Sequence, residues 1–124
     1  MKVAAIYHPR VMAVRPDQPL EVAAARMRDS QVRSLVVLGG NHLLGILTEH
    51  DLLRAAAEDA DVRFATVAEY MTHDPMSVSP DTDVREVIKA MLELDFRHLP
   101  VVRSGAVVGM VSLRDLVDMV LRNA

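Results

Sequence analysis

Apolar residues that recur three and four positions apart predict the helices of this chain. The clearest case is the stretch 84–92, where this spacing places five apolar side chains on one face. The stretch 20–27 repeats the pattern with smaller side chains. We expect each of these two helices to bury one face, with Asp17 and Asp81 just upstream as their N-terminal caps.

Short runs rich in β-branched residues, joined by tight turns, predict two β-hairpins. One turn is Gly39-Gly40-Asn41 and the other is Arg103-Ser104-Gly105, and glycine in such a position is typical of a hairpin loop. A shorter strand is expected before each first helix, at Ala13-Val14 and Ser77-Val78. The predicted hairpin strands are 34–38 with 43–47 and 98–102 with 107–111.

The chain repeats itself at an offset of 64 residues. The coincidences fall on turn positions and on core positions together, so chance explains them poorly. The same offset aligns Thr48 with Ser112, and a second helix is expected to begin at each of them. The matched residues are Met12, Val14, Pro16, Asp17, Met27, Arg33, Leu35, Val37, Gly45, Asp51 and Leu52 with Met76, Val78, Pro80, Asp81, Met91, Arg97, Leu99, Val101, Gly109, Asp115 and Leu116.

The repeat predicts an α/β (α+β) fold with the order β-α-β-β-α in each copy. We assign copy one to residues 1–58, a linker to 59–66 and copy two to 67–124. A unit of about 55 residues is only marginally stable alone. We therefore expect the two copies to pack sheet to sheet around a pseudo-twofold axis as one module.

Composition narrows the possible functions. Hydrophobic residues are 51% and charged residues 25%, as in a folded globular protein. The net charge of −3 and the 3% of aromatic residues disfavour nucleic-acid binding. The absence of cysteine excludes disulfides and thiolate metal sites. No apolar run reaches the roughly 20 residues of a membrane span, and no secretory signal is recognisable, so a cytoplasmic location is expected.

The motifs of copy two, in their order, resemble the cystathionine-β-synthase (CBS) domain. Any one of them is weak evidence, but their spacing and duplication together are specific, and the resemblance covers nearly the whole chain. The tandem resembles a free-standing CBS pair, also called a Bateman module. The motifs are Val67-Ala-Glu-Tyr-Met71-Thr72, Pro75-Met-Ser-Val78, Pro80-Asp81, Phe96-Arg-His-Leu-Pro-Val101 and Gly109-Met-Val-Ser-Leu-Arg-Asp115-Leu116.

The resemblance implies regulatory binding rather than catalysis. Such pairs bind AMP, ADP, ATP or S-adenosylmethionine in clefts between the repeats and signal to a partner. No cofactor is required, and a nucleotide would be the regulatory ligand. The sequence itself supplies no Walker loop and no evident catalytic triad. Asp51 and Asp115 could mimic a hydrolytic pair, but both are explained as helix caps.

The strongest candidate site residues are Asp115 with Ser112 and Asp51 with Thr48. A capping box alone explains both pairs. In this motif the Ser or Thr hydroxyl accepts from the backbone N–H three residues later, and the Asp carboxylate at that position accepts in return from the backbone N–H of the Ser or Thr. The resemblance adds a second role, in which the Asp accepts from both ribose hydroxyls and the Ser or Thr lies near sugar or phosphate. The two roles are compatible.

Basic residues at the start of the hairpins are the candidates for phosphate binding. The resemblance suggests this role for Arg33 and Arg97, and the planar guanidinium suits phosphate; a solvated strand end is the ordinary alternative. Copy two adds His98 and Arg114, whereas copy one has Ser34 and His50 at those positions. Copy two is therefore expected to contribute more to phosphate binding.

Further differences between the copies favour unequal sites. Ser77 offers a hydroxyl that could line the base and phosphate cleft, or could simply be an edge-strand side chain, and its counterpart is Ala13. Val36 stands where copy two has the family's proline. Tyr7 replaces the family's methionine, which copy two keeps as Met71.

An apolar stripe on the last helix suggests a homodimer, because second helices often form the dimer face in CBS pairs. Packing within the chain is the alternative. The stripe comprises Leu113, Leu116, Val117, Val120 and Leu121.

Two further hypotheses remain open for the protein as a whole: an interaction module that binds no nucleotide, and a metal- or stress-responsive protein. No metal site is predicted, since the five histidines are scattered.

Overall fold

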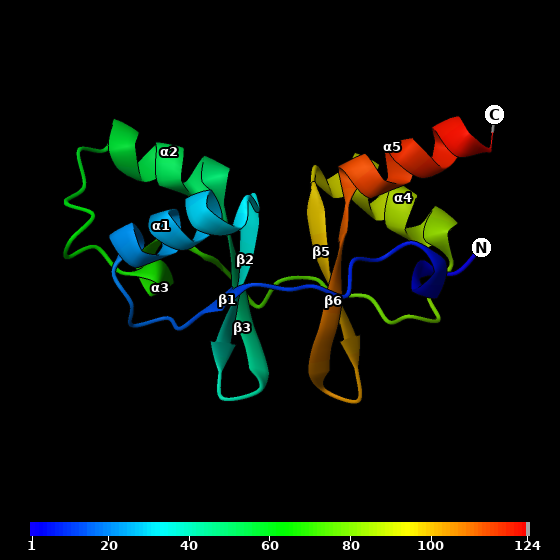
Figure 1. Cartoon of the computed structure of the whole chain (residues 1–124), viewed down its shortest axis with the longest axis horizontal. Coiled ribbons are helices and arrows are strands. Elements are labelled where there is room, and N and C mark those ends of the chain that lie inside the picture. Colours follow the sequence, from blue (N-terminus) through cyan, green and yellow to red (C-terminus); the bar gives the residue numbers. More distant parts are fainter. Residues whose placement is uncertain (124) are drawn as a thin grey trace. The chain divides into compact units, whose positions relative to one another are not determined.

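The fold consists of two hairpins, each accompanied by helices, in a computed structural model that describes residues 1–123 (Figure 1). Both predicted hairpins are confirmed, and each second helix begins directly after Thr48 or Ser112. The elements are η1 Val3–Ala5, β1 Ala13–Val14, α1 Leu20–Ser30, β2 Ser34–Gly39, β3 His42–Thr48, α2 Glu49–Ala57, α3 Val67–Tyr70, β4 Thr72–His73, α4 Val84–Leu94, β5 His98–Arg103, β6 Ala106–Ser112 and α5 Leu113–Arg122.

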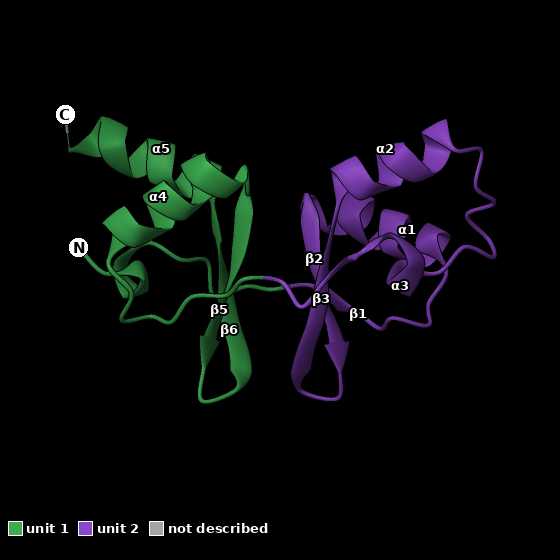
Figure 2. Ribbon diagram, turned by 180° about the vertical axis from the view of Figure 1, so that it is seen from behind, with its two compact units in different colours: residues 1–11, 76–124 green, residues 12–75 purple. Residues whose placement is uncertain are grey.

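The chain forms two compact units that cut across the two sequence copies. Unit 1 comprises Met1–Val11 with Met76–Ala124, and unit 2 comprises Met12–Pro75 (Figure 2). The leading segment of each copy thus packs on the body of the other copy.

Unit 2 contains a four-stranded sheet in the order β1-β2-β3-β4. β1 is parallel to β2, whereas the β2–β3 and β3–β4 pairs are antiparallel. Helices α1 and α2 lie on one face of this sheet (Figure 1). The core is built from residues of both copies: Val14, Leu20, Ala23, Met27, Leu35, Val37, Leu47, Ala55, Val67, Tyr70 and Met71.

Unit 1 repeats this plan with shorter edges. β5 and β6 form the antiparallel hairpin, and single bridges join Val78 to Val101 and His8 to Met110. In unit 2 the equivalent pairs are Val14 with Val37 and Thr72 with Ile46, all shifted by 64 residues. Ser77-Val78, expected as a strand, is therefore reduced to one bridge. The core is Val3, Val84, Val87, Met91, Leu99, Val101, Val111 and Leu116.

Glycine at position 109 allows the leading segment to reach β6. A Cβ atom at this position would collide with the Tyr7 ring and with the backbone oxygen of His8. Its counterpart Gly45 is equally confined, since a Cβ there would lie 2.7 Å from the backbone oxygen of Thr72. The coincidence of the two glycines in the repeat therefore reflects the same close approach of two chain segments.

The caps of the first helices differ from the prediction. Helix α1 follows Pro19 and has no side-chain cap, and Asp17 lies in the preceding turn. Its first free N–H groups, on Leu20 and Glu21, donate instead to the carbonyls of Ala65 and Val62, at 2.9 and 3.0 Å. The segment expected to be a linker thus serves as the cap. In α4 the cap is Asp83, which accepts from the Arg85 N–H at 2.8 Å, and not Asp81.

Helix α5 divides the predicted apolar stripe into two parts. Leu116 is buried in the core of unit 1 and belongs to no exposed face, because the helix turns it toward the sheet. The other four side chains of the stripe are exposed: Leu113, Val117, Val120 and Leu121. None of the helices formed by residues 1–123 has the length and apolar content that a membrane crossing requires.

Candidate functional site

Each of the two predicted Asp residues closes a capping box at the start of a helix. In unit 1 the Ser112 N–H donates to Asp115 Oδ2 at 2.8 Å, and the Asp115 N–H donates to Ser112 Oγ at 3.1 Å. In unit 2 the Thr48 N–H donates to Asp51 Oδ2 at 2.8 Å, and the Asp51 N–H to Thr48 Oγ1 at 3.4 Å. Both carboxylates therefore use Oδ2 for the cap, which leaves Oδ1 to be accounted for.

The two side chains are equally enclosed. The Asp51 and Asp115 side chains are each 12% exposed, so each presents only a small part of its carboxylate to solvent. The positive end of the helix dipole favours the charged carboxylate at this position. The hydrogen-bonding capacity that the capping box leaves free is on Oδ1, and a further partner of either carboxylate must contact this oxygen.

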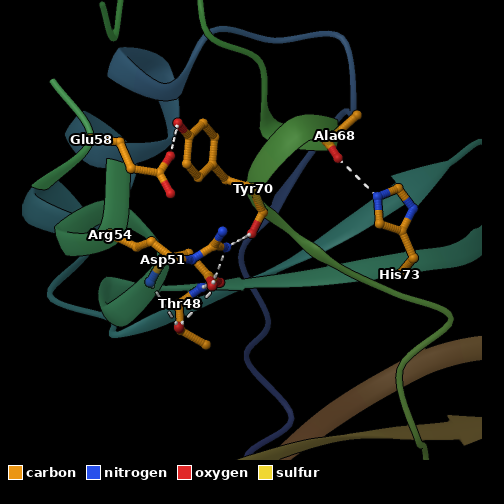
Figure 3. A network of polar contacts seen from close by, with 7 residues as sticks. All are labelled: Thr48, Asp51, Arg54, Glu58, Ala68, Tyr70 and His73. Atoms are coloured by element: carbon orange, nitrogen blue, oxygen red, sulfur yellow. Dashed lines mark hydrogen bonds and ion pairs between the residues drawn. The ribbon is translucent and has the colours of Figure 1, made fainter. Parts of the chain in front are cut away.

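In unit 2 the partner of Asp51 Oδ1 is the guanidinium of Arg54, one turn along α2 (Figure 3). Arg54 Nη2 lies 3.3 Å from Asp51 Oδ1 and donates to the Tyr70 carbonyl at 2.9 Å. The guanidinium also lies over the Tyr70 ring, 5.1 Å from its centroid. Three contacts thus hold this cation.

Tyr70 is itself fixed by Glu58. The Tyr70 hydroxyl donates to Glu58 Oε2 at 2.7 Å (Figure 3). This hydrogen bond, together with burial of the ring, raises the pKa of Tyr70 above its usual value. The ring that supports Arg54 is consequently anchored at both its backbone and its hydroxyl end.

In unit 1 the partner of Asp115 Oδ1 is His8. His8 Nε2 lies 2.8 Å from that oxygen, and the His8 side chain is 67% exposed. Its backbone is fixed, because His8 and Met110 exchange two N–H···O bonds of 2.9 Å. Asp118 occupies the α5 position that corresponds to Arg54, so the helix itself offers no cation there. The two carboxylates therefore differ in what faces them.

The basic residues lie at the same end of each hairpin as the capping box. The Arg97 carbonyl accepts from the Leu113 N–H at 2.8 Å, and the Arg33 carbonyl accepts from the Glu49 N–H at 3.0 Å. These bonds join the entry of the first strand to the start of the second helix. Within residues 1–123, the side chains of both arginines are exposed and form no ion pair.

The structure assembles most of the predicted residues of copy two at this end of β5 and β6. His98 is the register partner of Ser112 in the hairpin. Arg114 is exposed in the first turn of α5. Ser77 is exposed and precedes Val78, whose N–H donates to the Pro100 carbonyl at 2.9 Å. No hydrogen bond within residues 1–123 links Ser77 to the other predicted residues.

Two residues that contact the carboxylates, His8 and Arg54, were not predicted from the sequence. His8 belongs to copy one, and nothing in a shift of 64 residues pairs it with Asp115. The confinement of Gly109 was the available signal that a second segment approaches this part of β6. Arg54 stands three residues after Asp51 on a predicted helix, which is ion-pair spacing.

The arrangement is suited to binding polar ligands through hydrogen bonds. A carboxylate oxygen can accept from hydroxyl groups, and the exposed arginines can receive an anion. Across residues 1–123, no group of three or more His, Cys, Asp or Glu side chains is arranged to hold a metal ion.

Comparisons with known proteins agree with the repeat. The family model described as "CBS domain" matches residues 3–58 and 67–122. An uncharacterized 17.7 kDa protein of Acidianus ambivalens is 39% identical over 123 residues, which is 97% of this chain and 73% of that protein. Of several longer plant relatives, the chain spans only 17% to 21%.

Solved structures share the fold. The crystal structure of a CBS domain is 31% identical and superposes with a TM-score of 0.86, covering 92% of this chain and 91% of that one. The crystal structure of CBSX2 in complex with AMP is 26% identical, with a TM-score of 0.85 and coverage of 98% and 97%.

Proposed function

Because the chain belongs to the CBS domain family and carries two copies of the domain, we propose that it is a regulatory module that binds an adenosine nucleotide. In this proposal the ribose hydroxyls donate to an Asp carboxylate, and arginine side chains receive the phosphate. The protein signals to a partner rather than catalysing a reaction. The relative that was crystallised in complex with AMP supports this choice of ligand.

The observation that carries the proposal is the state of Asp115. Its Oδ2 is used by the capping box, whereas its Oδ1 faces, within the described part of the chain, only an exposed imidazole. Arg97, His98 and Ser112 lie at the same end of the hairpin. A vicinal diol needs an acceptor that can take two hydroxyl groups, and a carboxylate provides it. Asp51 with Thr48 and Arg33 forms the second, related candidate.

Regulation requires more than tight binding. A ligand shifts an equilibrium only when it binds one arrangement of the protein better than another. We therefore propose that the nucleotide stabilises one surface of the module, and that a partner protein binds this surface. Arg97, His98, Arg114 and Ser77 contribute to phosphate or base binding in this proposal.

Calorimetric titration of the folded protein with AMP, ADP, ATP and S-adenosylmethionine tests this function. Asp115→Asn should weaken binding of the ligand about ten- to a hundredfold, since hydrogen bonds to a charged group contribute about 1.5–3 kcal/mol. Asp118→Asn is the matched control, because Asp118 is exposed on the same helix. If none of the four ligands binds the folded wild type, the nucleotide function is refuted and an interaction module remains. A parallel thermal-shift assay with zinc tests the metal-responsive alternative.

We also propose a homodimer that uses the exposed apolar side chains of α5. Val117, Val120 and Leu121 are exposed on a helix whose buried contact is made by Leu116. Burial of such side chains between two copies is favourable by roughly 25 cal/mol per Å². Sedimentation velocity should show a dimer for the wild type and a monomer for Leu121→Glu. Equal sedimentation of the two proteins would exclude this interface.

A further inference from the structure

The carboxylates at the two helix starts are contacted by basic side chains that are held to very different extents. Asp115 faces His8, whose side chain is 67% exposed and, among residues 1–123, makes its polar contact with Asp115. Asp51 faces Arg54, whose side chain is 46% exposed and is held by Asp51 and by the carbonyl and ring of Tyr70. Both carboxylates are otherwise alike in burial and in their capping role.

We propose that His8 is a displaceable occupant of Asp115, whereas Arg54 is a fixed occupant of Asp51. The chain then binds one nucleotide through Asp115 and leaves Asp51 closed. This inference rests on the proposed function, and adds to it which copy binds and which residues decide that choice.

Displacement of His8 needs only a side-chain rotation. The reciprocal hydrogen bonds with Met110 keep the His8 backbone on β6 whether or not the imidazole points at Asp115. Because the imidazole is largely open to water, its contact with Asp115 contributes little to stability, and a ribose hydroxyl that donates to Oδ1 can replace it at small cost. Because the carboxylate is only 12% exposed, however, the imidazole and a ribose cannot both occupy it freely.

Displacement of Arg54 breaks a connected set of contacts. The guanidinium would leave Asp51, the Tyr70 carbonyl and the Tyr70 ring together. Tyr70 cannot follow the guanidinium, because it is buried in the core of unit 2 and its hydroxyl is bound to Glu58. The carbonyl of Tyr70 would also lose the Arg54 donor.

The sequence explains why the copies differ. The position of Arg54 is Asp118 in copy two, which cannot supply a cation to Asp115. The position of His8 is Thr72 in copy two, which cannot supply one to Asp51. The basic side chain that contacts the carboxylate therefore comes from a different segment in each unit, from the unit's own helix in unit 2 and from the leading segment in unit 1.

Titration with AMP at neutral pH tests the assignment through affinity and stoichiometry. The wild type should bind one AMP per chain, and Asp115→Asn should weaken this binding about ten- to a hundredfold. His8→Ala should bind AMP at least threefold more tightly with the same stoichiometry, a gain that mere structural damage would not produce. His8→Gln keeps a donor that can reach Oδ1 and should restore affinity close to that of the wild type.

Arg54→Met removes the cation and keeps a long apolar side chain on the Tyr70 ring. It should add a second AMP per chain, and should provide one tight site in the Asp115→Asn background. If the wild type binds AMP but His8→Ala binds it equally or more weakly, or if two AMP molecules bind the wild type, the inference is wrong while the nucleotide function stands. If the folded wild type binds another of the four ligands but not AMP, the same variants are titrated with that ligand. If it binds none of the four, the proposed function fails and this inference fails with it.

Discussion

At the scale of single residues, Gly109 decides how closely the leading segment approaches β6. We predict that Gly109→Ala is destabilising by about 1–3 kcal/mol, because the added methyl group overlaps Tyr7 and the His8 backbone. Urea denaturation measures the change, and hydrogen exchange of the Met110 N–H should accelerate with it. Gly105→Asn is the control, since the space around Gly105 is open and asparagine tolerates its positive φ of 81°. Equal stabilities of Gly109→Ala and wild type would contradict the close approach.

Tyr70 provides a second prediction, based on its titration. The hydrogen bond to Glu58 and the burial of the ring raise the pKa of Tyr70, so the fold favours the neutral phenol. The resulting stabilisation is present below pH of about 10 and is lost as the pH rises through the pKa of the folded protein. Ultraviolet titration in a Tyr7→Phe background should place the Tyr70 pKa above that of a free tyrosine. Glu58→Gln should lower it, and an unchanged pKa would mean that Glu58 is not its cause.

At the scale of elements, the cap of α4 predicts a dependence of stability on acid pH. The side-chain hydrogen bonds from Arg85, followed by its backbone N–H, lower the pKa of Asp83 to about 2. An Asp with a depressed pKa stabilises the fold above its unfolded value of about 3.9. This contribution should therefore fall as the pH drops from about 4 to about 2.

Asp83→Asn tests this assignment, because asparagine caps a helix but does not titrate. The stability difference between wild type and Asp83→Asn should shrink across that pH window in thermal melts. Asp81→Asn is the control, since Asp81 is exposed in the preceding turn and caps no helix. A constant difference between pH 4 and pH 2 would contradict the role of the Asp83 charge.

Helix α5 has a buried and an exposed apolar face, and truncation should affect the stability of the fold strongly on the first and weakly on the second. Leu116→Ala should cost about 2–5 kcal/mol, because Leu116 is buried in the core of unit 1. Leu121→Ala should change the stability of the fold by about 0.5 kcal/mol or less, because its side chain is 69% exposed. Chemical denaturation at low protein concentration compares the two. A large loss in Leu121→Ala under these conditions would mean that Leu121 packs within the chain.

At the scale of the whole molecule, the exchange of leading segments predicts which fragments fold. Unit 2 is continuous from Met12 to Pro75 and contains its complete core, whereas the fragment 1–58 lacks Val67, Tyr70 and Met71. We predict a cooperative thermal transition for 12–75, monitored by circular dichroism, and none for 1–58. Since both fragments hold about 60 residues, length alone cannot explain a difference. Equal behaviour would show that the leading segment of copy two contributes little to the core of unit 2.

The elements within each copy could be predicted because their signals are local. Turn glycines, apolar periods and the Ser or Thr before Asp fix the hairpins and second helices, and duplication identified Asp51 and Asp115 as equivalent. The caps of the first helices could not be predicted, because α1 takes its hydrogen-bond partners from Ala65 and Val62, far along the sequence.

For a related reason, the sequence did not predict which segments make up each compact unit. A shift of 64 residues shows which residues are equivalent, but not which copy each one packs against. His8 was therefore absent from the predicted site, although it contacts the residue predicted first, Asp115. A contact between a residue of copy one and a residue of copy two cannot be detected by aligning one copy with the other.

The order of synthesis acts unequally on the two units. Residues 1–11 leave the ribosome well before the rest of unit 1, because their partner strand β6 lies about a hundred residues later. Val3 is fully buried in the finished unit 1 but stays exposed to solvent during that interval. Residues 12–75 are complete earlier and can already fold. At about 5–20 residues per second the wait lasts several seconds. The nascent chain thus passes through a stage in which one unit is finished and the other exists only as an unpaired apolar leader, a natural point for chaperones to act.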